Sequence, residues 1–371
     1  MRLRILHILH SLQVGGLENG VVNLINRLDP ERFTHEICCI AEAGPMTERF
    51  TRLVPVHVIG KGSGADHLLP LKIARVVRRV RPHIVHTRNW GTIDGVLGGW
   101  LGGVRRIIHG EHGRDAADPQ GANRRRMQFR RLIDCLVTRY YTVSGDLRRW
   151  LVEEVRLPPH KVTHLMNGVD VDRLRPATDR SIARRHAGFE PGEFLIGTIG
   201  RLDPVKDQAT LVRAVTLLAA RGIHGARALI VGGGPEEAKL KNLAFELGVA
   251  DRVIFTGERQ DVSELMSSLD VFVLPSIAEG ISNTILEAMA LGLPVVATAV
   301  GGNPELVAGG VTGELFAVGD AEDLAHKLAW YMNDRWRCQE QGAAGRRRVE
   351  REFSLERMVE CYAHLYDEVS R

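Results

Sequence analysis

The length of 371 residues exceeds what one ordinary hydrophobic core supports and predicts two domains. A composition of 44% hydrophobic and 25% charged residues indicates a globular protein, and the lack of eighteen consecutive apolar residues argues against a membrane span. The five cysteines show no CxxC spacing, which disfavours a disulfide framework or a zinc site and favours a reducing cytoplasm.

The net charge of +4 conceals an asymmetry between the two halves of the chain. Residues 1–168 hold 26 Lys and Arg against 15 Asp and Glu, a balance of +11, which leaves −7 for the remainder. A basic N-terminal half indicates an anionic partner or surface, and a soluble arginine-rich surface is the alternative.

Short apolar runs alternate with helical patterns along the first half. The N-terminal run is broken by His7 and His10 and lacks a small-residue cleavage site, so a first strand is expected there rather than a signal peptide. A helix is expected over 17–28. The expected strands lie at 3–9, 35–40, 54–59, 84–87, 106–108 and 136–143. This alternation predicts a parallel sheet with helices on both faces.

The pattern restarts after a segment from Met166 to about Pro191 that is rich in Pro, Asn, Gly and Asp. New strands are expected in FLIGTIGRL, ARALIVGGGPEE, RVIFTG, DVFVLPS and PVVATAV. We therefore predict an α/β protein with two doubly wound, Rossmann-like domains, residues 1–168 and 169–353, with a C-terminal helix near 354–371 packing back on the first. Ligands bind outside the carboxyl ends of such strands, so a cleft with one ligand on each side is expected.

The stretch LPSIAEGISNTILEAMALGLPVVAT places Glu279 and Glu287 around the start of a helix. Ser282 is the expected N-cap of a helix from Asn283 to about Leu291, and a helix N-terminus attracts anions. Neither carboxylate suits a phosphate, but each can accept hydrogen bonds from hydroxyls. A ligand with sugar hydroxyls on both sides of a phosphate fits this pattern, and a nucleotide-sugar is such a ligand.

The cations for such a phosphate follow the strand FLIGTIG, where GRLDPVKD provides Arg201 and Lys206. Arginine can grip two oxygens at once and lysine supplies a point charge. Gly280 removes side-chain bulk where backbone amides can approach an oxygen-rich ligand. No DxD pair near a strand end is available for a divalent metal, so these two cations are expected to stabilise a leaving diphosphate. An ordinary charged surface loop is the alternative.

These stretches, together with VGGGPE, NGVD and GGLENGVVNLINRL, occur in the order typical of glycosyltransferase family 4, which the chain resembles over essentially its whole length. EGISNTILEAMALGLPVVAT looks like the E-x7-E region of that family. The resemblance implies the GT-B fold and a retaining transfer from a UDP- or GDP-sugar to a glycan or polyprenyl-linked acceptor. HGEHGRD further resembles bacterial exopolysaccharide-associated sugar transferases, which implies a role in exopolysaccharide or cell-surface glycan synthesis.

The resemblance also implies roles for single residues. Glu287 would bind the ribose and Glu279 the transferred sugar, while Arg201 and Lys206 would bind the diphosphate. His112 would lie near the donor sugar. The other implied donor-binding residues are Gly15, Gly16, Gly280, Ile281, Ser282 and Asn283. No carboxylate is placed as a nucleophile, so the family implies front-face attack in which the leaving phosphate takes the acceptor proton, without a metal or other cofactor.

RIIHGEHGRD contains a second polar cluster. A metal site formed by His109, Glu111 and His112 is an alternative that the close spacing at a strand end disfavours. A histidine satisfied by the backbone is a further alternative for His112. Arg114 and Asp115 are candidates for the acceptor side.

Two other enzyme classes are disfavoured by their motifs. VGGGPE lacks the third glycine of GxGxxG, which argues against a nicotinamide dehydrogenase. Ser144 in YTVSGD lacks the GxSxG context of a nucleophile and is expected to cap a helix.

Basic residues mark the first domain as the acceptor side. LKIARVVRRVRP reads as an amphipathic helix whose basic face carries Lys72, Arg75, Arg78 and Arg79, and NRRRMQFRRL adds five arginines. Nucleic acid is the rival anion, but interleaved aromatic residues and nucleic-acid signatures are missing. We therefore expect a cytoplasmic protein in peripheral contact with the anionic inner face of a membrane, and no nucleic-acid partner.

Two alternatives to the transferase remain open at this point. One is a sugar-nucleotide epimerase of the same fold, which would need no acceptor. The other is a non-catalytic nucleotide-sugar binding protein.

Overall fold

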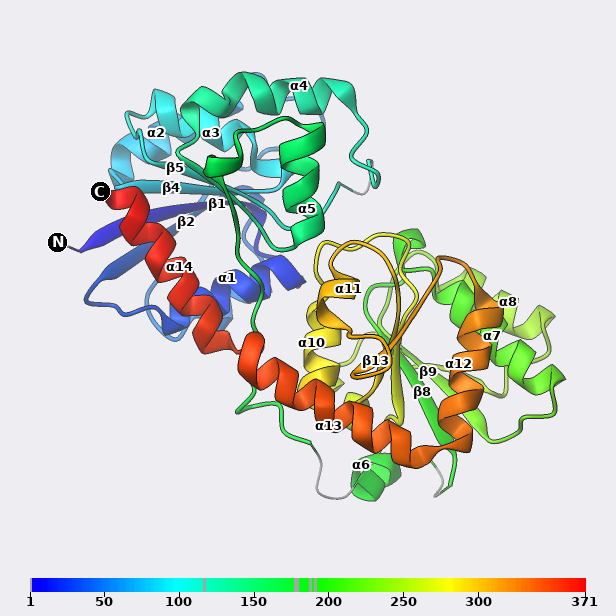
Figure 1. The fold of residues 1–371 in the computed structure, drawn as a ribbon. Helices are drawn as coiled ribbons and strands as arrows, with labels where there is room; N and C mark the ends of the chain where they lie inside the picture. The colour runs from blue at the N-terminus through cyan, green and yellow to red at the C-terminus, as the bar shows by residue number, and fades with distance from the viewer. Residues whose placement is uncertain (1, 116–117, 177–179, 187–188, 190–191) are drawn as a thin grey trace. The chain divides into compact units, whose positions relative to one another are not determined.

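The computed structural model describes residues 2–115, 118–176, 180–186, 189 and 192–371. Contacts divide the chain into two compact units, Met1–Gly168 with Leu355–Arg371, and Val169–Ser354. Each unit contains a parallel sheet with helices packed against it (Figure 1). The predicted fold class, two doubly wound α/β domains, is confirmed.

The first unit is built on a seven-stranded sheet in the order β3-β2-β1-β4-β5-β6-β7. Its strands are β1 (Leu3–Ser11), β2 (Phe33–Glu42), β3 (Val56–Val58), β4 (Ile84–Arg88), β5 (Ile107–Glu111), β6 (Arg139–Thr142) and β7 (Val162–His164). Its helices are α1 (Gly16–Arg27), α2 (Leu69–Val80), α3 (Asp94–Leu101), α4 (Arg124–Ile133), α5 (Gly145–Arg149) and α14 (Leu355–Ser370). Short single-turn helices are η1 (Pro45–Arg49), η2 (Trp90–Thr92), η3 (Asp134–Leu136), η4 (Trp150–Glu154) and η5 (Pro159–Lys161).

The strand register of this sheet determines which polar side chains share a face. His7 of β1 is paired with His86 of β4, and Arg88 of β4 is paired through Gly110 of β5 with Tyr141 of β6. Paired residues of parallel strands point to the same face. α1 and α14 pack on each other, and α14 packs on β4 at this face (Figure 1). The helix at the C-terminal end of the chain therefore covers the polar row of the first sheet.

The second unit is built on a six-stranded sheet in the order β10-β9-β8-β11-β12-β13. Its strands are β8 (Phe194–Ile199), β9 (Ala226–Val231), β10 (Val253–Phe255), β11 (Val271–Leu274), β12 (Val295–Thr298) and β13 (Gly313–Phe316). Its helices are α6 (Arg180–His186), η6 (Pro204–Lys206), α7 (Gln208–Ala220), α8 (Glu237–Glu246), α9 (Val262–Ser267), α10 (Asn283–Ala290), α11 (Asn303–Leu306), α12 (Ala321–Asn333) and α13 (Arg335–Glu352). The strands are nearly all apolar, as expected for a sheet buried on both faces.

Two expected strands are shorter than their apolar runs. The run at 54–59 forms only Val56–Val58, and that at 136–143 forms only Arg139–Thr142. In the second case residues 134–136 make a single 3₁₀ turn that leads out of α4, and none of these three residues is buried. The connecting segment expected from 166 to 191 includes residues 177–179, 187–188 and 190–191, which lie outside the described residues.

Among the described residues, no helix is both long and apolar enough to cross a lipid bilayer.

Candidate active site

Lys206 and Glu279 form an ion pair between two loops. Lys206 lies in η6 after β8, and Glu279 lies in the loop between β11 and α10. Lys206 Nζ lies 2.6 Å from Glu279 Oε1, and Ser276 Oγ donates a second hydrogen bond to the same oxygen at 2.7 Å. The Glu279 side chain is only 9% exposed, whereas that of Lys206 is 30% exposed. The carboxylate is therefore fixed, and it orients an ammonium group that remains accessible.

Two backbone features place Lys206 at this position. The Ile277 N–H donates to the Val205 carbonyl at 2.8 Å, which joins the loop after β8 to the loop after β11. Asp203 caps η6 through a hydrogen bond from the Val205 N–H at 3.2 Å, and Asp207 adopts a left-handed conformation with φ of 43°. Aspartate tolerates that conformation better than most residues, so the sequence DPVKD suits this sharp turn.

Arg201 lies on the same loop but is not part of this pair. Its side chain is 71% exposed and forms an ion pair with Asp203 at 2.9 Å. Of the two residues predicted to bind the diphosphate, Lys206 is therefore held by Glu279, whereas Arg201 projects into solvent.

The glycines of VGGGPE allow the loop after β9 to approach the loop after β8. A Cβ on Gly232 would collide with the Gly200 carbonyl, and one on Gly234 would collide with the Leu202 carbonyl. The Leu202 N–H donates to the Gly233 carbonyl at 2.8 Å. These glycines thus support the loop that carries Arg201 and Lys206.

Ser282 caps α10 as predicted, because its hydroxyl accepts the Ile285 N–H at 3.3 Å. Gly280 and Ile281 are buried in the preceding loop, and the Gly280 carbonyl accepts the Gly302 N–H at 3.0 Å. Asn283 and Glu287 are half-buried on α10, one helical turn apart. The helix therefore has the polar face that the sequence predicts.

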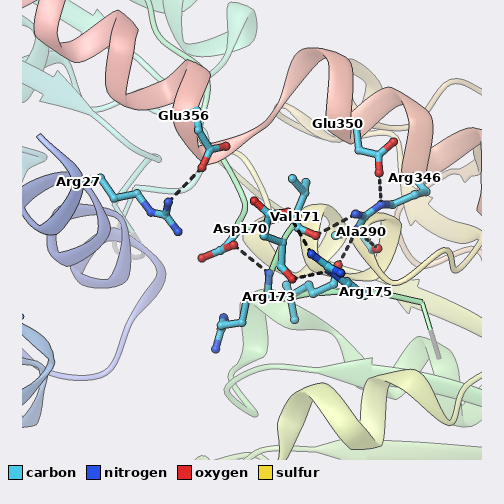
Figure 2. Close-up of polar contacts among 11 residues, drawn as sticks. Arg27, Asp170, Val171, Arg173, Arg175, Ala290, Arg346, Glu350 and Glu356 are labelled. Atoms are coloured by element: carbon cyan, nitrogen blue, oxygen red, sulfur yellow. Dashed lines mark hydrogen bonds and ion pairs between the residues drawn. The ribbon is translucent and has the colours of Figure 1, made fainter. Parts of the chain in front are cut away.

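The other end of α10 is held by Arg346 of α13 (Figure 2). The Arg346 guanidinium donates to the Ala290 carbonyl at 2.6 Å and to the Val171 carbonyl at 2.8 Å, and it forms an ion pair with Glu350 at 2.6 Å. A cation at a helix C-terminus interacts favourably with the helix dipole. Arg346 contacts segments that are far apart in the sequence, so these contacts could not be predicted from the sequence.

In the first unit, Gly16 and His112 line one small pocket together with Arg88, Asn167 and Tyr362. Gly15 precedes α1 without a side-chain cap, and a Cβ at Gly15 would collide with the Glu18 carboxylate. Two residues predicted from the sequence are thus brought together, and Arg88 is a buried cation that the sequence reasoning missed.

His112 is held by two hydrogen bonds. Its backbone N–H donates to Asn89 Oδ1 at 2.7 Å, and its Nε2 lies 2.6 Å from the Tyr141 hydroxyl. Burial, followed by the charge of Arg88, lowers the pKa of His112 to about 3. The imidazole is therefore neutral at physiological pH.

His109 and Glu111 point to the opposite face of the sheet from His112, because side chains alternate along a strand. Thr87 Oγ1 lies 2.7 Å from His109 Nδ1, and Arg130 Nε donates to Glu111 Oε1 at 2.7 Å. Burial acts to raise the pKa of Glu111, but Arg130 and His109 outweigh it and lower it to about 2. The three side chains considered as a metal site are therefore not convergent, and the described residues contain no group of three His, Cys, Asp or Glu arranged around a metal position.

The two acceptor-side candidates form ion pairs with neighbouring helices. Arg114 pairs with Asp146 at 2.9 Å, and Asp115 pairs with Arg126 at 3.2 Å. Arg114 and Asp146 also line a pocket of about 560 Å³ with Trp150.

Comparisons with known proteins identify the family and the fold of this chain. The profile of "Glycosyltransferase Family 4" matches residues 14–173, and that of "Glycosyl transferases group 1" matches residues 179–348. The lipopolysaccharide core biosynthesis mannosyltransferase LpsB of Rhizobium meliloti is 35% identical over 56% of this chain and 61% of its own length. A UDP-Gal:alpha-D-GlcNAc-diphosphoundecaprenol alpha-1,3-galactosyltransferase of Escherichia coli is 25% identical over 90% of this chain and 89% of its own length.

The match therefore spans less than two thirds of the length of LpsB. Among solved structures, Anabaena HepE in complex with UDP and glucose has a TM-score of 0.85 at 20% identity and covers 99% of this chain and 100% of its own. Sucrose-phosphate synthase of Thermosynechococcus elongatus has a TM-score of 0.82 at 22% identity, covering 99% of each chain. The chain belongs to glycosyltransferase family 4 and has the GT-B fold.

Proposed function

We propose that the protein is a retaining glycosyltransferase that moves a sugar from a UDP- or GDP-sugar to a glycan or polyprenyl-linked acceptor. The observation that carries this proposal is the Lys206–Glu279 pair in front of α10. A cation that a buried carboxylate orients, next to a helix N-terminus, suits a diphosphate with a sugar attached.

In the proposed reaction, Lys206 and Arg201 stabilise the negative charge that develops on the departing diphosphate. Stabilisation of developing charge by preorganised donors is commonly the largest single contribution to catalysis. Glu279 accepts hydrogen bonds from hydroxyls of the transferred sugar, and Glu287 from those of the ribose. Gly280, Ile281, Ser282 and Asn283 supply the remaining contacts of the second unit with the donor.

Gly15, Gly16 and His112 act from the first unit. The acceptor hydroxyl attacks the anomeric carbon from the face that the diphosphate leaves, and the leaving phosphate oxygen takes its proton. The two side-chain cations serve in place of a metal, so no metal or other cofactor takes part. The acceptor enters beside Arg114 and Asp115.

Surface-glycan synthesis is the proposed context, and the names of the relatives support it. One relative acts in lipopolysaccharide core biosynthesis, and another is named for an acceptor attached to diphosphoundecaprenol. An acceptor attached to a lipid lies at a membrane surface. Peripheral contact with the inner face of the membrane through α2 is therefore part of the proposal.

The side chains of α2 support this membrane contact. Arg75, Arg78 and Arg79 are exposed, and two exposed leucines, Leu68 and Leu71, lie at the start of the same helix. Apolar side chains next to basic ones are typical of helices that lie in a membrane interface.

The experiment is a transfer assay with a panel of UDP- and GDP-sugars and polyprenyl-diphosphate glycans, with products identified by mass spectrometry and the anomeric configuration by NMR. A product with the configuration of the donor supports the proposal. Inversion would exclude the retaining mechanism, and conversion of the donor sugar without any acceptor would identify an epimerase. Donor binding without turnover on any acceptor would indicate a binding protein.

A further inference from the structure

We propose that Arg88 and Tyr141 are positioning residues that hold His112 with its proton on Nδ1, so that His112 offers an N–H donor to an oxygen of the sugar bound beside it. This inference rests on the proposed function, because the site of His112 is taken to be the sugar site. The chain of hydrogen bonds that determines the tautomer begins at Arg88.

Arg88 is 2% exposed and sits between two histidines. Its Nη1 lies 3.2 Å from His7 Nδ1, and its Nη2 lies 3.3 Å from His86 Nδ1. A guanidinium has donors and no acceptor. Both Nδ1 atoms must therefore accept, and both histidines, which burial keeps neutral, carry their proton on Nε2.

The proton on His86 Nε2 determines the role of the Tyr141 hydroxyl. His86 Nε2 lies 3.1 Å from Tyr141 Oη and donates to it. A hydroxyl that accepts a hydrogen bond keeps its own proton to donate. The acceptor left for the proton of Tyr141 is His112 Nε2, at 2.6 Å.

Since Nε2 of His112 accepts from Tyr141, the single proton of the neutral ring lies on Nδ1. Within the described part of the chain, no residue forms a hydrogen bond with this Nδ1. His112 lines the pocket that contains Gly16 and Asn167. A hydroxyl oxygen of a sugar can accept from that N–H, whereas the other tautomer would present a lone pair there.

The side chains of this hydrogen-bond network are far apart in the sequence, and the fold brings them together. Gly110 lies between Arg88 and Tyr141 in the register, and a Cβ on it would collide with the Tyr141 ring. Tyr366 of α14 also reaches His86 Nδ1, at 2.9 Å.

The charged and titratable groups near His112 act on its pKa in both directions. Arg88 lowers the pKa of His112, and so does His109, while Glu111 acts to raise it. Glu18 of α1 is influenced by Arg88 but forms no ion pair with it among the described residues. The positive charge of Arg88 therefore disfavours protonation of His112.

Histidine tautomers in the full chain labelled with ¹⁵N-histidine provide the test, with the His112 signal assigned by its loss in H112Q. We expect the proton on Nδ1 in the wild type at pH 7. Y141F should shift the population towards the Nε2–H tautomer and lower kcat about tenfold with little change in KM for the donor. A wild-type His112 with its proton on Nε2, or an imidazolium at pH 7, would overturn the inference.

Y140F is the matched control, because the Tyr140 hydroxyl is buried without a hydrogen-bond partner in the described residues. It removes the same atom from the neighbouring position of β6 and should change neither the tautomer nor kcat. Equal losses of kcat in Y140F and Y141F would show a structural effect only and would overturn the positioning role. The tautomer is measured without turnover, so absent transferase activity with the expected tautomer would refute the proposed function alone.

Discussion

Lys206 Nζ and Glu279 Oε1 lie 2.6 Å apart although 73 residues separate them in the sequence. The pair links the loop after β8 to the loop after β11, and each loop follows a strand that lies next to the other in the sheet. Parallel strands end at the same edge of a sheet, so adjacency of β8 and β11 is sufficient to bring the two charges together.

The first prediction concerns the cations. K206A should lower kcat on the order of a hundredfold, because a donor to the departing diphosphate is lost, and R201A should act in the same direction. Steady-state kinetics with a competent donor and acceptor measure this effect. K239A removes a lysine that pairs with Glu236 on the surface of the same unit and should leave kcat unchanged. Full activity in the R201A/K206A double variant would contradict the assignment, as would complete loss of wild-type activity with a chelator.

The second prediction separates the two glutamates. E287Q should weaken binding of the nucleoside diphosphate, because this ligand contains the ribose. E279Q should leave that affinity nearly intact but impair binding or turnover of the intact donor. Calorimetry with both ligands measures the difference. Equal losses of nucleoside diphosphate affinity in the two variants would refute the division of roles.

A third prediction follows from the buried histidines of the first unit. Burial and nearby arginine charges lower the pKa of His35 and His112 to about 3, and those of His7 and His86 lie well below their ordinary value. The unfolded chain binds protons near pH 6.5 and the folded chain does not, so stability must fall as pH falls below about 6.5.

Each of these histidines contributes a slope of up to about 1.4 kcal/mol per pH unit. Urea unfolding at pH 7.5, 6.5 and 5.5 gives the free energy of unfolding. H326Q, a change on the exposed side of α12, should keep the slope, whereas H35Q should reduce it. A free energy of unfolding that does not change over this range would contradict the neutral state of the cluster.

The fourth prediction concerns Arg130 and Glu111, which form a buried ion pair 2.7 Å long. R130M should destabilise the protein by about 3–5 kcal/mol, because it leaves a buried carboxylate without its partner. The double variant R130M/E111L should recover much of this loss, since both charges are then absent. Thermal and urea unfolding compare the variants, and a double variant no more stable than R130M would show that the loss arises from packing instead.

The fifth prediction tests the membrane contact. Neutralising Lys72, Arg75, Arg78 and Arg79 should strongly reduce sedimentation with anionic vesicles, because each basic residue contributes about 1 kcal/mol near such a surface. Binding should weaken towards 1 M salt, where the screening length is about 3 Å. The control variant neutralises Lys239, Lys241, Arg252 and Arg259 of the second unit, which removes the same charge. Indifference of the wild type to anionic vesicles at low salt would exclude the membrane contact.

The sequence was sufficient for features that depend on near neighbours in the chain. Ser282 and Ser144 cap helices as predicted, each through a backbone N–H three residues later. Five of the six strands of the second sheet were recognisable from their apolar runs, whereas β13 (Gly313–Phe316) was not expected from the sequence. Such features depend on local backbone geometry, which a few adjacent residues determine.

The contacts around His112 could not be predicted in the same way. His86 and Tyr141 are separated by 55 residues, and His86 and Tyr366 by 280. Their meeting depends on strand order and on a one-residue choice of register, since a slip by one residue would turn each side chain to the opposite face. The alternation of polar residues in IVHTR and RYYT was the only pattern in these strands that indicated the network. It predicts which side chains share a face only once the order of the strands in the sheet is known.

The placement of α14 has a consequence for biosynthesis. The first unit takes its inner tyrosines, Tyr362 and Tyr366, from a segment that the ribosome makes after the entire second unit. During translation, α14 therefore does not yet cover the polar row of the first sheet when the second unit is already able to fold. A nascent chain stalled before residue 355 should bind chaperones through that uncovered face, and release of stalling should end the interaction.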